Sequence, residues 1–165
     1  SSSSAGAVVP ALGGCSGGRS TERGAPAAMG GTPSAPRLVQ QLASDRPSVR
    51  QAAVRGICSL AAIPEKRRYV AIAGCVPPLI ALVAAGDPQI VENAAAALSH
   101  LAMHPENKVE IAGAGGVGAI VDFLRGLQQD PLAAPGAKGA AAAALANLSS
   151  RCAANQNEAA NAGAI

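Results

Sequence analysis

The sequence predicts an all-α protein, a solenoid of stacked helical repeats. Alanine is abundant and aromatic residues make up only 1% of the 165 positions, which favours helix over strand. Proline and glycine recur where helices would start and stop. A pattern beginning at Ala35 returns at Val76 and again at Val117, in two steps of 41 residues. A period of this length that holds several helices is typical of a stacked solenoid.

Residues 1–34 are expected to form a disordered, flexible linker, because Ser, Gly, Ala and Pro dominate the stretch. Such a composition buries too little apolar surface to offset the entropy lost on ordering. The solenoid is then expected to cover residues 35–165. It would consist of about two and a half to three units, at about 35–75, 76–116 and 117–165.

Each unit is expected to contain three helices, most clearly in the middle of the chain. Asp87-Pro88 is a helix start, with a capping carboxylate before a proline at the first helical position. Apolar residues then follow at three- and four-residue spacing, which indicates one buried face. Pro105 ends this helix and opens a short one, and Gly113–Gly116 separate that from the next apolar helix, Val117–Leu124.

The third unit carries an insertion within Gly126–Gly139, which contains Pro131 and Pro135. Proline fixes φ and removes a donor, and glycine loosens the backbone. The stretch is therefore expected to loop out between two helices and to extend neither of them. Extra loop length costs little free energy.

One segment of the chain is similar to a known repeat. Residues 78–117, PLIALVAAGDPQIVENAAAALSHLAMHPENKVEIAGAGGV, resemble the armadillo repeat, particularly the plant type found in U-box ubiquitin ligases and vacuolar armadillo proteins. The resemblance extends over about residues 35–165 and is interrupted in the third unit. It implies a right-handed superhelix of three-helix repeats, whose longest helices line a concave groove that binds peptides.

The resemblance also implies a strip of binding residues. The third helix of an armadillo repeat presents an Asn to the groove, where its amide can bond a peptide backbone. Asn147 matches that position. The implied partner-binding groove comprises Gln51, Arg55, Ser59, Glu92, His100 and Asn147. The Trp positions of nuclear-import receptors hold Arg55, Ala96 and Ala143 here, so an import receptor is disfavoured.

The leading functional hypothesis is a non-catalytic module that presents this groove to a partner protein or extended peptide. The alternative is the substrate-binding arm of a U-box E3 ubiquitin ligase. A remote alternative is a nucleotide-binding enzyme, because Gly113–Gly118 fits GxGxxG. The same place in the first unit, Ile72–Pro77, keeps the helix break and loses the glycine pattern, which favours a plain turn.

Other classes of function have little support in the sequence. The 13 basic and 10 acidic residues leave a net charge of +3, less than nucleic-acid readers usually carry. The run Lys66–Arg68 is interpreted as a solvated helix face. The uncharged stretch Tyr69–Gly86 has two prolines at its centre, so no membrane span is expected. No catalytic constellation is recognisable, and the chain is predicted not to be an enzyme.

No cofactor or metal is predicted. His100 and His104 are four residues apart but have no third ligand at metalloprotease spacing. The cysteines are far apart and are interpreted as free thiols of a reducing compartment, the cytoplasm or the nucleus. A stack of so few repeats is also expected to be marginally stable or to self-associate, because about three are needed to bury a continuous core.

Overall fold

A computed structural model describes residues 34–127 and 134–163, all of which are helix or connecting turn. Within these residues there is no strand, and the predicted all-α solenoid is confirmed. The described residues all belong to the contact unit Thr32–Ile165. The helices are α1 (Ala35–Leu42), α2 (Pro47–Ala62), the 3-10 turn η1 (Pro64–Lys66), α3 (Arg67–Ile72), α4 (Val76–Ala85), α5 (Pro88–Leu101), α6 (Pro105–Gly113), α7 (Gly116–Gly126), α8 (Pro135–Ser149) and α9 (Ala153–Asn161).

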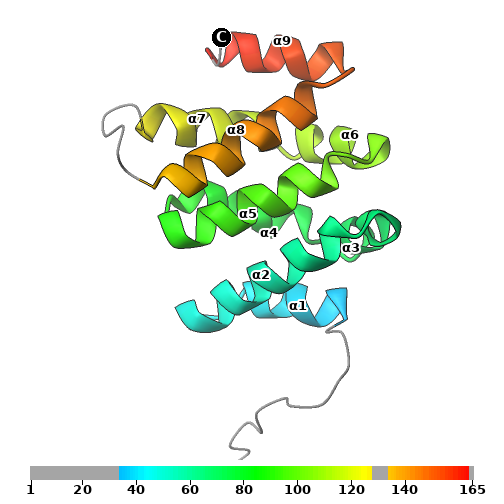
Figure 1. The fold of residues 1–165 in the computed structure, drawn as a ribbon, viewed down its shortest axis with the longest axis vertical. Helices are drawn as coiled ribbons and strands as arrows, with labels where there is room; N and C mark the ends of the chain where they lie inside the picture. The colour runs from blue at the N-terminus through cyan, green and yellow to red at the C-terminus, as the bar shows by residue number, and fades with distance from the viewer. Residues whose placement is uncertain (1–33, 128–133, 164–165) are drawn as a thin grey trace, which may run out of the picture. The chain divides into compact units, whose positions relative to one another are not determined.

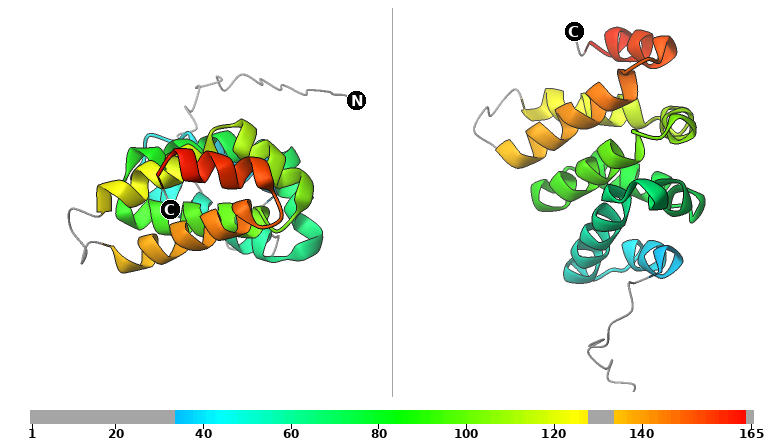
Figure 2. Two further views of the ribbon diagram at one scale, coloured as in Figure 1. Left: turned by 90° about the horizontal axis from the view of Figure 1, so that it is seen from above. Right: turned by 45° about the vertical axis from the view of Figure 1, so that its right-hand side comes forward.

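The helices of this unit are stacked in repeating layers. The long helices α2, α5 and α8 pack side by side in chain order and form one face (Figure 1). Helices α1, α4 and α7 lie behind them, as the views from above and from the side show (Figure 2). The short helices α3 and α6 lie along one edge of the stack. The two complete layers, α3–α4–α5 and α6–α7–α8, therefore repeat the same short, middle and long helix.

The core is built from small and branched aliphatic side chains. Leu60, Leu101 and Leu148 occupy equivalent positions near the ends of the three long helices, and all are buried. Ala97 and Ala144, which are also buried, lie on α5 and α8. Alanines at such positions let neighbouring helices approach closely and pack densely without aromatic residues. The abundance of alanine thus allows the helices to stack closely.

Helix ends follow the signals in the sequence. Helix α5 starts at Pro88, as predicted, and the Asp87 carboxylate accepts a hydrogen bond from the Gln89 N–H at 3.1 Å. This bond satisfies one of the free N–H groups of the first turn. Helix α4 ends at Ala85, before Gly86 in the left-handed conformation with φ of 76°, which costs glycine little.

The glycines of Gly113–Gly118 form a turn between two helices. Helix α6 ends at Gly113, and Gly115 has a φ of 78° directly before α7. A Cβ on Gly116 would lie 2.8 Å from the Ile111 carbonyl oxygen, so close packing requires glycine there. A dinucleotide fingerprint needs a strand ahead of its glycines. The nucleotide-binding interpretation is therefore wrong: a helix stands where the strand should be.

The insertion differs from its prediction at both ends. Gly126 is the last residue of α7, and α8 begins at Pro135 and runs through Gly139, so parts of Gly126–Gly139 do extend the neighbouring helices. Pro135 is tolerated because its missing N–H would be unpaired at the first helical position anyway. Residues 128–133 of the predicted loop lie outside the described residues, as does nearly all of the predicted linker 1–34.

Candidate functional site

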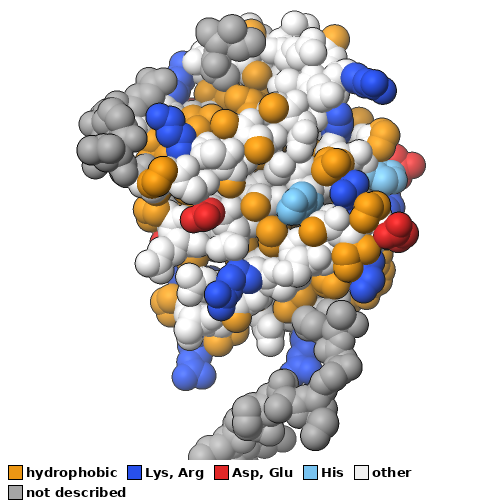
Figure 3. Space-filling model, viewed as in Figure 1, with side chains coloured by type: hydrophobic (Ala, Val, Ile, Leu, Met, Phe, Trp, Pro, Cys, Tyr) orange, Lys and Arg blue, Asp and Glu red, His pale blue; other side chains and the backbone are white. Residues whose placement is uncertain are grey.

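The six residues of the predicted groove lie on the three long helices. Gln51, Arg55 and Ser59 belong to α2, Glu92 and His100 to α5, and Asn147 to α8. The face built by these helices carries few charged side chains, set among small polar and apolar ones (Figure 3). The face therefore has no large cluster of like charges among its described residues.

Helix α2 contributes three of the six residues, and two of these, Arg55 and Ser59, are exposed. Arg55 is exposed and forms no ion pair with any described acidic residue. The Ser59 hydroxyl donates to the Arg55 carbonyl one turn earlier at 3.0 Å, so its donor is satisfied within the helix. Gln51 is half-buried. Arg55 is thus the charged side chain on α2 that is free to meet a ligand.

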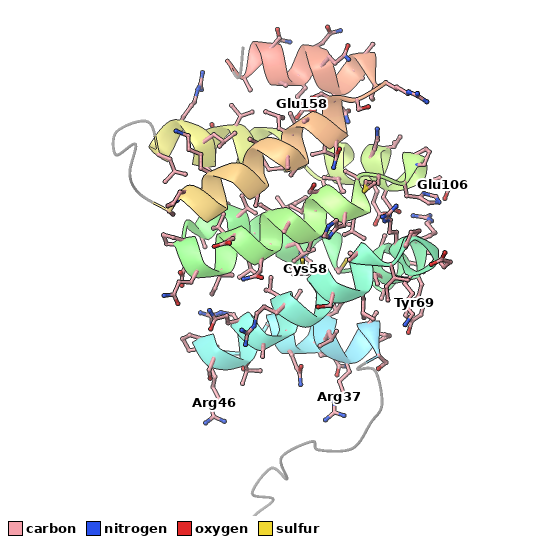
Figure 4. All side chains as sticks on the ribbon, viewed as in Figure 1. Arg37, Arg46, Cys58, Tyr69, Glu106 and Glu158 are labelled. Atoms are coloured by element: carbon pink, nitrogen blue, oxygen red, sulfur yellow. The ribbon has the colours of Figure 1, made fainter. Side chains whose placement is uncertain are left out.

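His100 is tied to the preceding repeat. Its Nδ1 lies 3.9 Å from the sulfur of Cys58, which is located between α2 and α5 (Figure 4). Burial raises the pKa of the Cys58 thiol, which keeps the sulfur protonated near neutral pH. The sulfur–imidazole contact therefore joins a neutral thiol on α2 to an imidazole on α5 across the joint between repeats.

Asn147 repeats this arrangement one layer further along. Its Nδ2 donates to the backbone oxygen of Ser99 at 3.1 Å and to the Ser99 hydroxyl at 2.9 Å. Ser99 and Cys58 are equivalent in the repeat, as are Asn147 and His100. The expectation that the Asn147 amide is free for a ligand is therefore half wrong, because its nitrogen is committed within the protein. Its carbonyl oxygen has no partner among the described residues.

Glu92 is exposed but lies over the start of α8. A Cβ on Gly136 would come within 2.6 Å of both Glu92 carboxylate oxygens. A negative charge at a helix N-terminus is favourable because the first N–H groups there are unpaired. Glu92 thus contacts the next repeat and is also exposed to solvent.

Two asparagines that the sequence did not single out hold the layers together. Asn107 is fully buried, and its Nδ2 donates to the carbonyl oxygens of Leu101 at 3.2 Å and Arg67 at 3.3 Å. Its equivalent, Asn155, donates to the Leu148 carbonyl at 2.9 Å. Both amides satisfy carbonyls at the C-terminal end of a long helix. The recurrence of Asn shortly after the ends of α5 and α8 was the available signal.

The basic run Lys66–Arg68 is less solvated than expected. Arg67 Nε donates to the Ala61 carbonyl at 3.1 Å. Arg68 forms ion pairs with Glu106 at 2.9 Å and Glu110 at 3.1 Å, and a hydrogen bond with the Asn107 Oδ1 at 3.1 Å. The interpretation as a plain solvated face is wrong for these two arginines, since Arg67 connects α3 to the end of α2 and Arg68 connects α3 to α6.

The described residues offer neither a metal site nor a membrane-spanning helix. Among the described residues, no three His, Cys, Asp or Glu side chains gather closely enough to hold a metal ion. No single described helix is long and apolar enough to cross a membrane. Residues Pro64–Ile72 and Val76–Ala85 reach that length and hydropathy only together, and they meet at an angle of 87°.

Comparison with known proteins was made on sequence and on structure. Residues 64–103 match the family model of the armadillo/beta-catenin-like repeat. This segment runs from η1 through α5, one short, one middle and one long helix. The matched repeat begins with η1 and the short helix α3, whereas the unit expected from the sequence begins with the next helix, α4. A search of curated proteins found no match.

Several solved structures share the fold. They include computationally designed armadillo repeat proteins for modular peptide recognition, with 27% identity over 78% of this chain and a TM-score of 0.69. An engineered protein has 26% identity over 79% and a TM-score of 0.70. A designed armadillo repeat protein in complex with the peptide (KR)4 has 24% identity over 78% and a TM-score of 0.69. The chain spans 52% of each of these proteins. The repeat match and the structural likeness support membership of the armadillo repeat family, and the chain has the armadillo α-solenoid fold.

Proposed function

We propose that this chain is a non-catalytic binding module that holds an extended peptide or protein segment on the face of α2, α5 and α8. The fold supports a scaffold role, and the printed names of two similar designed proteins speak of peptide recognition and of a bound peptide. The carrying observation on this chain is that Arg55, which is exposed, and the Asn147 carbonyl oxygen lie on the same face, each without a side-chain partner among the described residues. An acidic side chain would meet the guanidinium, while the Asn147 oxygen accepts a peptide N–H.

The test is a titration with a labelled peptide of alternating Asp and Leu, compared with the (KR)4 peptide. The acidic peptide is expected to bind more tightly. Arg55→Glu should weaken its binding roughly three- to tenfold, with a smaller effect at high salt, because an exposed pair is weak and screened. Arg37→Glu is the matched control, since Arg37 is exposed and points away from the stack at its α1 end (Figure 4). Preference for (KR)4, or equal effects of both variants, would contradict the proposal.

A second candidate is the substrate-binding arm of a U-box ubiquitin ligase, of the plant type that residues 78–117 resemble. In that case the same face would bind the protein to be ubiquitinated, and the ligase activity would lie in a separate domain. Full-length sequence on both sides of this chain tests it directly, through the presence of a U-box.

The proposed location is the cytoplasm or the nucleus. Cys58, Cys75 and Cys152 are free thiols, which suits a reducing compartment. Imaging of a tagged full-length protein would test this.

A further inference from the structure

We infer that a cleft between α6 and the α8–α9 turn is a second binding site, one that accepts an apolar side chain next to a carboxylate of the bound segment. The cleft has a volume of about 580 Å³. Its lining includes Met103, Lys108, Val109, Asn147, Arg151 and Cys152. The inference rests on the proposed function, since the cleft adjoins Asn147, where the binding face ends.

Among the described residues, the joint beside the cleft lacks an ion pair that the preceding joint has. At the preceding joint Arg68 reaches across to Glu106 and Glu110. The residue equivalent to Arg68 in the next repeat is Val109, and the residue equivalent to Glu106 is Ala154. A long charged side chain and its partner are thus replaced by two short apolar ones, of which Val109 lines the cleft.

The apolar part of the cleft is accessible. Val109 is 70% exposed and Met103 is 53% exposed, and both belong to the small set of large apolar side chains that the described residues leave in solvent. Methionine is flexible and adapts to different apolar ligands. Covering these two side chains with an aliphatic group of a partner would remove apolar surface from water.

The positive charges of the cleft favour a carboxylate next to the apolar group of the ligand. Lys108 and Arg151 line it, and no acidic side chain does. The Lys108 ammonium donates to the Ser150 carbonyl at 2.6 Å, which holds its charge at the cleft wall. Arg151 is exposed and pairs with no described acidic residue. Its φ of 57° is unusual for a residue other than glycine. A carboxylate beside the apolar group complements these two cations.

The segment that binds in the cleft is therefore acidic and rich in leucine, and not basic. The probe is the labelled peptide of alternating Asp and Leu, with two counterparts in which Ser replaces Leu or Lys replaces Asp. The Ser counterpart is expected to bind about tenfold more weakly, because the aliphatic side chain supplies the burial. The Lys counterpart should bind more weakly still at low salt, because it meets like charges.

Two variants test the cleft on the whole chain. Val109→Arg with Ala154→Glu introduces at this joint the ion pair that Arg68 and Glu106 form at the preceding one. The second acidic partner is already present, because Glu158 is equivalent to Glu110. The new side chains are expected to fill the cleft. Arg151→Glu reverses an exposed charge and leaves the core untouched. Both should weaken binding of the Asp–Leu peptide, the first about tenfold and the second roughly three- to tenfold, while Arg37→Glu leaves it unchanged.

The outcomes separate this site from the proposed binding face. Failure of the Asp–Leu peptide to bind, or binding that neither cleft variant weakens, overturns the cleft. Loss of affinity in Arg55→Glu alone leaves the binding face in place without the cleft. Loss in the cleft variants alone supports the cleft and refutes the role of Arg55. A thermal melt of each variant shows that it remains folded, and Arg151→Glu decides the matter if the double variant does not fold.

Discussion

The side-chain nitrogen of Asn147 on α8 donates to both oxygens of Ser99 on α5, at 3.1 Å to the carbonyl and 2.9 Å to the hydroxyl. Ser99 is only 7% exposed. One repeat earlier, Cys58 and His100 meet at the same two positions. These polar residues of the long helices thus connect one repeat to the next, so the proposed ligand could use only the polar atoms that these contacts leave free.

Asn147→Ala should therefore lower stability in the absence of any ligand. Two oxygens of a nearly buried serine would lose their donor, which costs about 1–2 kcal/mol. Urea unfolding of Asn147→Ala, Ser99→Ala and the double variant measures the coupling between the two side chains. A coupling near zero would mean that the contact contributes nothing to the joint between repeats.

Asn107→Ala is expected to be more damaging. This variant removes a fully buried amide that bonds Leu101, Arg67 and Arg68, so buried carbonyls are left unpaired, at a cost of about 2–4 kcal/mol. Asn157→Ala is the matched control, because Asn157 lies on the exposed side of α9. Equal losses for the two variants in urea unfolding would rule out the structural role of Asn107.

Two glycines near the start of α8 should respond oppositely to alanine. A Cβ on Gly139 meets nothing within 4 Å, so Gly139→Ala should stabilise the protein by about 0.5–1 kcal/mol through helix propensity. Gly136→Ala must displace the Glu92 carboxylate and should gain less. In a Glu92→Ala background the two gains should become equal. Thermal melts of the four variants check this, and a full gain for Gly136→Ala alone would show that Glu92 does not hold its position.

The sequence predicted what depends on local rules. Asp87-Pro88 and Gly113–Gly116 mark helix boundaries because capping and backbone freedom act over a few residues. Pro135 was misassigned by the same rules, since proline stops a helix in its interior and starts one at its first position. The repeat period correctly predicted that the long helices stack, and the family resemblance placed the six candidate residues on them.

The lateral contacts could not be predicted from a single repeat. Whether Asn147 faces solvent or Ser99 depends on how far α8 is rotated about its own axis against α5, which the packing of the buried alanines decides. Arg68 is a similar case, because its partners Glu106 and Glu110 belong to the next repeat. An alignment of units shows which positions are equivalent, but not which of them touch across a joint.

Stability should also fall at alkaline pH because of Cys75. This thiol is fully buried directly before α4, and burial together with the charge of Glu110 raises its pKa from an ordinary value of 9.0 to about 12. Below about pH 9 both folded and unfolded chains keep the proton, and the thiol adds no pH dependence. Above it the unfolded chain loses the proton first, so unfolding is favoured by up to about 1.4 kcal/mol per pH unit until the folded pKa is reached.

Comparison with Cys75→Ala isolates this effect, because every other side chain is the same in both proteins. The variant is expected to be less stable at neutral pH, by about 1 kcal/mol for the lost packing of a small buried side chain. The difference in stability should then shrink, and reverse, between about pH 9 and pH 11, because the buried wild-type thiol increasingly disfavours the folded state. The measurement is urea unfolding of both proteins across this range with a reductant present. A difference that stays constant up to about pH 11 would mean that the Cys75 thiol ionises as easily in the folded chain as in the unfolded one.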